Sequence, residues 1–67
     1  MYYGYQARLI VEYDDLQTKV EKLKNFLGSD VYKTLEPEEQ LDLQEQLMYM
    51  QNYLSILWKR LNRKGLI

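Results

Sequence analysis

The sequence predicts an all-α fold: an antiparallel two-helix hairpin with a short helical turn between the helices, assembled into a homo-oligomeric helical bundle. Three observations predict it. Two segments carry apolar residues at alternating steps of four and three, the spacing of helices that pack lengthwise on a partner. The connection between them, residues 28–36, is short, so the helices should lie side by side and antiparallel. The second segment carries more apolar residues than one neighbouring helix could cover, so we expect further copies of the chain to pack against it.

The first helix is predicted over residues 6–27, where the apolar spacing extends over nearly three heptads. Acidic residues lie in the early part of this helix and lysines in the later part, the order that complements the helix dipole. Gly28 follows, at a position where a helix C-terminus favours a glycine in the left-handed conformation. We therefore expect the helix to end near Leu27. The residues that should form its packing seam are Leu9, Tyr13, Leu16, Val20, Leu23 and Leu27.

A short helical turn is predicted over residues 30–35. Val31 and Leu35 are four residues apart, so they share one face that can fold back over the end of the hairpin. Ser29 or Asp30 would cap this turn. Antiparallel packing would also bring the late lysines of the first helix near the acidic start of the second. Exposed pairs of this kind contribute about 0.2 to 1 kcal/mol each, so they select the orientation and add little stability.

The second long helix is predicted over residues 37–63. Pro37 suits its first position, and the two glutamates that follow place negative charge where exposed amides favour it. Thr34 or Glu36 would be its cap, and the helix should end before Gly65. The residues of its seam are Leu43, Leu47, Met50, Leu54, Leu57 and Leu61. The apolar residues that lie beside the seam or on other sides are Leu41, Met48, Tyr49, Tyr53, Ile56 and Trp58.

Composition limits the class of protein. With 67 residues the chain is a single domain, 1–67, whose core would be marginal without further stabilisation. It has no cysteine and no histidine, so disulfides and the usual structural zinc sites are excluded and self-association is the remaining source of stability. A formal charge of -1 argues against general binding to nucleic acid. No apolar segment approaches the roughly 18 to 20 residues of a membrane span, so we expect a soluble cytoplasmic protein without a membrane partner.

Catalysis is not expected. A hydrolase or transferase needs a nucleophile activated by a base, or a metal held by several ligands, and the chain offers neither a cysteine nor a histidine for these roles. The carboxylates of Glu38, Asp42 and Glu45 share one side of the second helix, where they read as a solvated acidic face. The three glycines are isolated from one another, so no phosphate-binding loop is present. We predict no enzyme, no metal site and no cofactor.

Aromatic and basic side chains are predicted to meet at the open end of the hairpin, where the start of the first helix lies beside the end of the second. Aromatic faces stack on bases, and guanidinium groups bind phosphate in a forked geometry. Repeated around an oligomer axis, this cluster could bind a small anionic ligand that contains a ring. The alternative is that the aromatics are buried between subunits while the cations neutralise the helix C-terminus and nearby acids. The candidate ligand-binding residues are Tyr5, Arg8, Tyr53, Trp58, Arg60, Arg63 and Lys64.

Three stretches carry a family resemblance: ARLIVEYDDL, KLKNFLGS and EEQLDLQEQLMYMQNYLSILWKRL. Residues 7–61 resemble a family of small helical-hairpin proteins that are common in phage genomes and named after a crAss-like phage member. That family usually has Ser or Thr before the second helix, where this chain has Glu36 and Pro37, a difference that concerns only the cap. The polar residues that set the resemblance apart from a generic coiled coil are Arg8, Glu12, Gln46 and Arg60.

The resemblance implies a phage protein that acts in the cytoplasm of the infected bacterial host. Several small, oligomeric, helical phage proteins trap nucleotide second messengers of bacterial immunity, and this chain is similar to them in size, origin and its aromatic and basic end. The leading hypothesis is a non-enzymatic homo-oligomer that sequesters a cyclic nucleotide or a cyclic ADP-ribose-type ligand, an anti-defence sponge. The competing hypothesis is a helical module that binds a host or phage protein through its surplus apolar surface. A third is a structural protein without a ligand.

Overall fold

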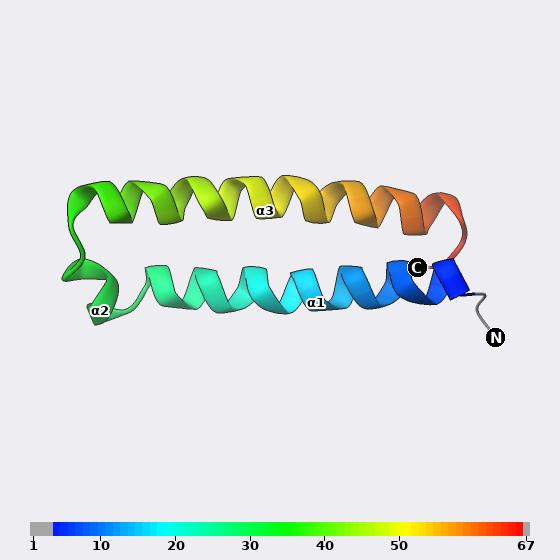
Figure 1. Cartoon of the computed structure of the whole chain (residues 1–67), viewed down its shortest axis with the longest axis horizontal. Coiled ribbons are helices and arrows are strands. Elements are labelled where there is room, and N and C mark those ends of the chain that lie inside the picture. The colour runs from blue at the N-terminus through cyan, green and yellow to red at the C-terminus, as the bar shows by residue number, and fades with distance from the viewer. Residues whose placement is uncertain (1–3, 67) are drawn as a thin grey trace.

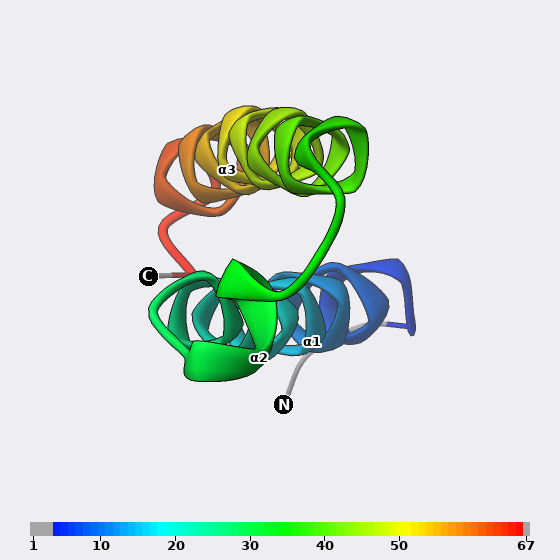
Figure 2. The ribbon, with the colours of Figure 1, turned by 90° about the vertical axis from the view of Figure 1, so that its left-hand side faces the viewer.

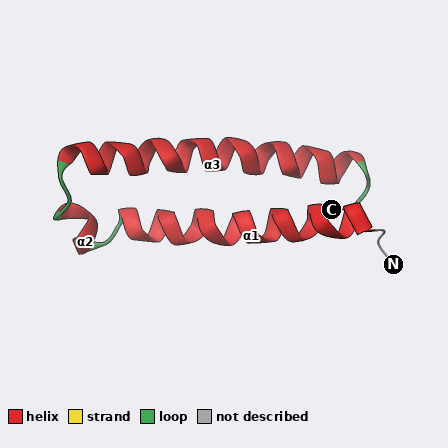
Figure 3. Ribbon diagram, viewed as in Figure 1, coloured by secondary structure: helices red, strands yellow, loops and turns green. Residues whose placement is uncertain are grey.

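The chain is a helical hairpin in a computed structural model that describes residues 4–66. These residues form three helices, α1 (Gly4–Leu27), α2 (Asp30–Lys33) and α3 (Pro37–Arg63). Figure 1 shows α1 and α3 side by side and antiparallel, with α2 at one end and the start of α1 beside the end of α3 at the other. The view along the rod shows α1 and α3 as two layers (Figure 2). The all-α prediction is confirmed for the described residues, which include no strand (Figure 3).

The core is a narrow seam between α1 and α3. It is built from the leucines and the valine that the heptad spacing places on the facing sides of the two helices. Leu57 is 0% exposed and Leu61 is 1% exposed, while the other seam residues of α3 are half-buried. A hairpin with principal dimensions of 46 × 16 × 15 Å has room for one such layer. Within residues 4–66 the buried hydrophobic side chains are Leu9, Leu16, Val20, Leu57 and Leu61.

The two helix ends that are followed by glycine differ in conformation. The sequence suggested a left-handed Gly28 after α1, but Gly65 is the glycine with positive φ, 71°, among the described residues. At Gly65 the chain closes α3 with paired reverse hydrogen bonds: the Leu66 N–H donates to the Leu61 carbonyl at 2.9 Å, and the Gly65 N–H to the Asn62 carbonyl at 3.1 Å. Leu66 thereby packs on the core. After α1 the chain instead enters a tight turn, in which Gly28 N–H donates to the carbonyl three residues back at 3.2 Å.

Side-chain hydrogen bonds fix the closed end of the hairpin. Ser29 caps α2, because its Oγ accepts from the Tyr32 N–H at 3.2 Å, as the sequence allowed. The Gln40 side chain of α3 donates to the backbone carbonyls of Tyr32 and Leu35, each at 3.0 Å. In return the Tyr32 hydroxyl donates to the Gln40 carbonyl at 3.2 Å and accepts from Gln44 Nε2 at 2.7 Å. These contacts tie α2 and the segment that follows it to the first turns of α3.

The start of α3 has no side-chain cap. Glu36 occupies the N-cap position without a capping hydrogen bond, and Pro37 stands at the first helical position as expected.

Ion pairs between α1 and α3 contribute little to holding the hairpin together. Within residues 4–66 the ion pair that forms lies inside α2, between Lys33 and Asp30 at 3.7 Å. The short connection, and not ion pairing, therefore sets the antiparallel orientation of the hairpin.

Much apolar surface remains outside the seam. On α3 the side chain of Tyr49 is 60% exposed, that of Ile56 is 54% exposed and that of Trp58 is 46% exposed. Of the helices in the described part of the chain, none combines the length and the apolar character needed to cross a membrane. One hairpin thus leaves uncovered the surplus that the sequence indicated. The large hydrophobic residues that are exposed are Tyr5, Val11, Val31, Leu41, Met48, Tyr49, Tyr53, Ile56 and Trp58.

Candidate functional site

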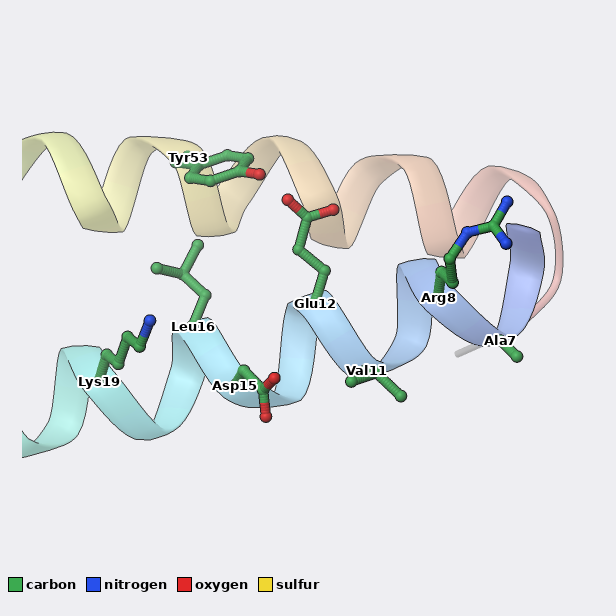
Figure 4. Close-up of a pocket in the computed structure, with 8 residues that line it drawn as sticks. All are labelled: Ala7, Arg8, Val11, Glu12, Asp15, Leu16, Lys19 and Tyr53. Atoms are coloured by element: carbon green, nitrogen blue, oxygen red, sulfur yellow. The ribbon is translucent and has the colours of Figure 1, made fainter. Parts of the chain in front are cut away.

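A shallow hollow of about 580 Å³ lies along one side face of the hairpin, mostly on α1 and reaching α3. Figure 4 shows its walls: charged side chains project from successive turns of α1, and the ring of Tyr53 extends from α3 above Leu16. The floor is apolar and the rim is charged. The residues that line it are Ala7, Arg8, Val11, Glu12, Asp15, Leu16, Lys19 and Tyr53.

The spacing of the charged residues on α1 explains why they converge. Arg8, Glu12, Asp15 and Lys19 follow one another at steps of four, three and four, so they occupy one flank of the helix beside the buried seam. Because α1 and α3 are antiparallel, this flank and the flank of α3 that carries Tyr53 belong to the same side of the hairpin. The local fold therefore brings an aromatic face and a row of charges together.

The electrostatics of the hollow are mixed. Arg8 and Lys19 stand near its two ends, and Glu12 and Asp15 lie between them (Figure 4). The guanidinium group of Arg8 lies beside Gly4, because a Cβ at Gly4 would be 3.7 Å from Arg8 Nη1. Two cations can each hold a phosphate, while the carboxylates between them can accept hydrogen bonds from ring N–H or hydroxyl groups. The arrangement suits a ligand with separated negative groups and polar donors between them.

A second hollow of about 500 Å³ continues the same face along α3. It shares Tyr53 with the first hollow, so the tyrosine separates the two and is open to both. Gln46 is exposed here, with its Nε2 at 3.8 Å from the sulfur of Met50. The residues that line this second hollow are Asp42, Glu45, Gln46, Tyr49, Met50 and Tyr53.

The structure brings some of the predicted site residues together. Arg8 and Tyr53 line the first hollow. Tyr5 and Lys64 meet at the open end of the hairpin, where Lys64 Nζ lies 5.0 Å from the centroid of the Tyr5 ring, a cation–π contact. Tyr5 and Lys64 therefore contact each other and do not line the first hollow.

The other predicted residues lie elsewhere. Trp58 follows Tyr53 by five positions on α3, which turns it by about 140° around the helix axis, so the two rings point to different sides of the hairpin. Arg60 and Arg63 are exposed in the last turns of α3 and do not line the first hollow. The sequence prediction grouped residues that lie at the same end of the hairpin. These residues point in different directions around their helices, so the structure does not bring all of them together.

The sequence interpretation missed Lys19, Asp15 and Val11 as residues of this face. The signal was present, because their spacing from Arg8 follows the helical repeat. Glu12 belongs to the acidic early part of the first helix and to the family pattern, but it is not among the predicted ligand-binding residues. A cluster of at least three acidic side chains arranged to hold a metal ion does not occur in residues 4–66.

Comparison with known proteins identifies relatives of the chain. The sequence model of a family called Sequestin matches residues 3–63. A protein of Enterobacteria phage T4, "Uncharacterized 7.5 kDa protein in denB-rIIB intergenic region", is 40% identical over 58 residues, which are 87% of this chain and 91% of that protein. No solved structure matches the chain.

Proposed function

The chain belongs to the Sequestin family, and on this premise we propose that it is a non-enzymatic phage protein that binds and sequesters a nucleotide second messenger of bacterial immunity. The family name points to sequestration, and a relative is encoded by a phage. The more specific resemblance, to a family named after a crAss-like phage, stays a prediction. The observation that carries the proposal is the hollow in which Tyr53 of α3 faces the charged flank of α1.

Tyr53 supplies the recognition of a base. Its side chain is 44% exposed in the hairpin, so one face of the ring is available without unfolding anything. A base stacked on an aromatic side chain gains roughly 1 to 3 kcal/mol, largely independent of which base it is. The side chain of Leu16 lies below the ring and would exclude water from the other side of the ligand (Figure 4).

Arg8 and Lys19 supply the recognition of phosphate. They stand at opposite ends of the hollow, so a ligand with two separated phosphates can reach both. Glu12 and Asp15 between them disfavour a phosphate in the middle and accept hydrogen bonds from base or ribose donors. This pattern favours a cyclic nucleotide or a cyclic ADP-ribose-type ligand over a continuous polyanion, in line with the expectation from the formal charge that the chain has no general affinity for nucleic acid.

Sequestration fits the absence of catalytic groups from the sequence, since it requires tight binding and no turnover. The protein would act in the cytoplasm of the infected host, where the messengers are made, and without a cofactor. Its working form in this proposal is a homo-oligomer, because the exposed apolar residues of α3 need a cover that one chain does not provide.

The test is thermal unfolding against a panel of cyclic dinucleotides, larger cyclic oligonucleotides and cyclic ADP-ribose isomers at fixed protein concentration. A ligand at about 100 times its dissociation constant adds about 2.7 kcal/mol to the folded state, which raises the Tm of so small a chain by roughly 10 to 20 °C. Lys19→Ala should remove most of this shift, whereas Lys24→Ala, the same change on α1 outside the hollow, should retain it. A panel that leaves Tm unmoved would contradict the proposal.

A second function is favoured by one observation, the exposed apolar side chains along α3. They could dock on a helix or groove of a host or phage protein. Binding of a partner by the wild-type chain, together with a monomeric state in its absence and no response to nucleotides, would support this alternative.

A further inference from the structure

The outward flank of α3 carries six residues whose spacing is the same in both directions and whose charge changes from acidic at one end to basic at the other. Going along the helix, two acidic residues are followed by an apolar residue, and then an apolar residue is followed by two basic residues. The steps between them are three, four, seven, four and three, each of which returns to nearly the same side of an α-helix. The six residues, here called the α3 flank, are Asp42, Glu45, Tyr49, Ile56, Arg60 and Arg63, and all are exposed in the hairpin.

We propose that the α3 flank is a twofold interface with a second copy of this chain, in which the two α3 helices run antiparallel. The midpoint of the pattern falls between Asn52 and Tyr53. With a twofold axis there, Asp42 stands opposite Arg63 of the second copy and Glu45 stands opposite Arg60. Symmetry makes each pairing occur twice.

The apolar centre fits the same register. Tyr49 stands opposite Ile56 of the second copy on each side of the axis, and these side chains are 60% and 54% exposed in the hairpin. The second hollow, lined by Asp42, Glu45 and Tyr49 among others, lies along this flank and would receive the Ile56 side chain of the second copy. Apolar contact is thus central and charged contact peripheral, the usual layout of a protein interface.

Charge complementarity selects a second copy over another occupant, and antiparallel over parallel packing. A parallel copy would place the acidic end against an acidic end and the basic end against a basic end. In the antiparallel copy the acidic end of each α3 flank faces the basic end of the other, so a second copy of the same chain can pair the charges at both ends. The small core of five buried side chains among residues 4–66 gives a physical reason for such a cover.

The register also bears on the ligand site, a step that rests on the proposed function. Tyr53 lies near the axis and beside the α3 flank, on the side that faces the first hollow. A twofold axis perpendicular to the two helices places both first hollows on the same side of the dimer. The Tyr53 ring of the second copy then stands at the edge of each hollow, so two tyrosines and two charged α1 flanks border one shared surface.

The test uses charge reversal at the two ends of the α3 flank. The acidic-end variant is Asp42→Lys with Glu45→Lys, and the basic-end variant is Arg60→Glu with Arg63→Glu. Each variant alone places like charges together at both ends of the dimer and should self-associate at least about tenfold more weakly than wild type. An equal mixture of the two variants restores opposite charges at both ends, so it should form a one-to-one dimer as tight as wild type.

Sedimentation equilibrium measures the association constants, and native mass spectrometry distinguishes the mixed dimer from the two homodimers. A control variant, Asp14→Lys with Glu21→Lys, makes the same charge change on α1 away from the α3 flank and should associate like wild type. Wild-type-like association of both single-end variants, or a mixture no tighter than its components, would overturn the proposal. So would a monomeric wild-type chain. No nucleotide is present, so the outcome is independent of whether the ligand proposal holds.

Discussion

Replacing Tyr53 separates base stacking from every other contribution to ligand binding. Tyr53→Ala removes the ring that faces the charged flank of α1, while the buried seam is untouched because Tyr53 lies outside it. Loss of one base stack costs roughly 1 to 3 kcal/mol, which is about a 5- to 150-fold increase in Kd. Tyr53→Phe keeps the aromatic face and loses only the hydroxyl, so it should bind within about twofold of wild type.

The matched aromatic control is Trp58→Ala. Trp58 is 46% exposed, close to the 44% of Tyr53, but it projects from a different side of α3. Isothermal titration with the messenger that stabilises the wild-type chain gives Kd for each variant, and circular dichroism checks that the helices persist. If Trp58→Ala weakens binding more than Tyr53→Ala, the site lies on the other face of the hairpin. If Tyr53→Phe is as weak as Tyr53→Ala, the hydroxyl and not the ring is the contact.

Three further predictions concern the hairpin itself, each checked by the free energy of unfolding in urea. Gln40→Ala removes two hydrogen bonds of 3.0 Å at the closed end and should cost about 1 to 3 kcal/mol, whereas exposed Gln51→Ala should cost little. Gly65→Ala should cost about 1 kcal/mol because its φ is 71°, while Gly28→Ala, with ordinary φ and its nearest neighbour at 3.6 Å, should be neutral or slightly stabilising. Leu57→Ala should cost about 3 to 5 kcal/mol and leave the chain largely unfolded, because the side chain is 0% exposed. Equal effects of the two glycine changes, or of the two glutamine changes, would contradict these assignments.

The long helices were predictable from the sequence because their spacing and boundaries have local causes. Pro37 and its glutamates mark the start of α3, and Gly65 marks its end. Gly28 and Gly65 both follow a long helix in the sequence, but only Gly65 has a positive φ among the described residues. Ser29 directly after Gly28 caps a new helix, so the chain turns without a left-handed residue, while Leu66 after Gly65 folds back onto the core and requires one. The residue that follows the glycine therefore decides its conformation.

The candidate site was only partly predictable, for a geometric reason. Residues at one height along a hairpin are easily grouped from the sequence, which is how Trp58 was placed with Tyr53 and Arg8. Which of them meet depends on their angle around each helix and on the sides that antiparallel packing unites. The side chains of Tyr32 and Gln40 show the same limit, because their contact joins residues eight positions apart across a turn whose path no local pattern fixes.

Ligand binding and self-association become linked if both proposals hold. When Tyr53 of a second copy borders each hollow, the dimer binds the ligand more tightly than the single hairpin does, and by thermodynamic reciprocity the ligand strengthens the dimer by the same factor. A messenger that stacks on both tyrosines would then convert a weak self-association into a stable one, so that capture of the signal assembles the protein that holds it. Sedimentation of the wild-type chain near its own dissociation constant, with and without ligand, measures this factor. For the basic-end variant, which associates weakly by itself, added ligand should shift the equilibrium toward the dimer from a lower starting point, and a ligand without effect on either protein would place the site within a single hairpin.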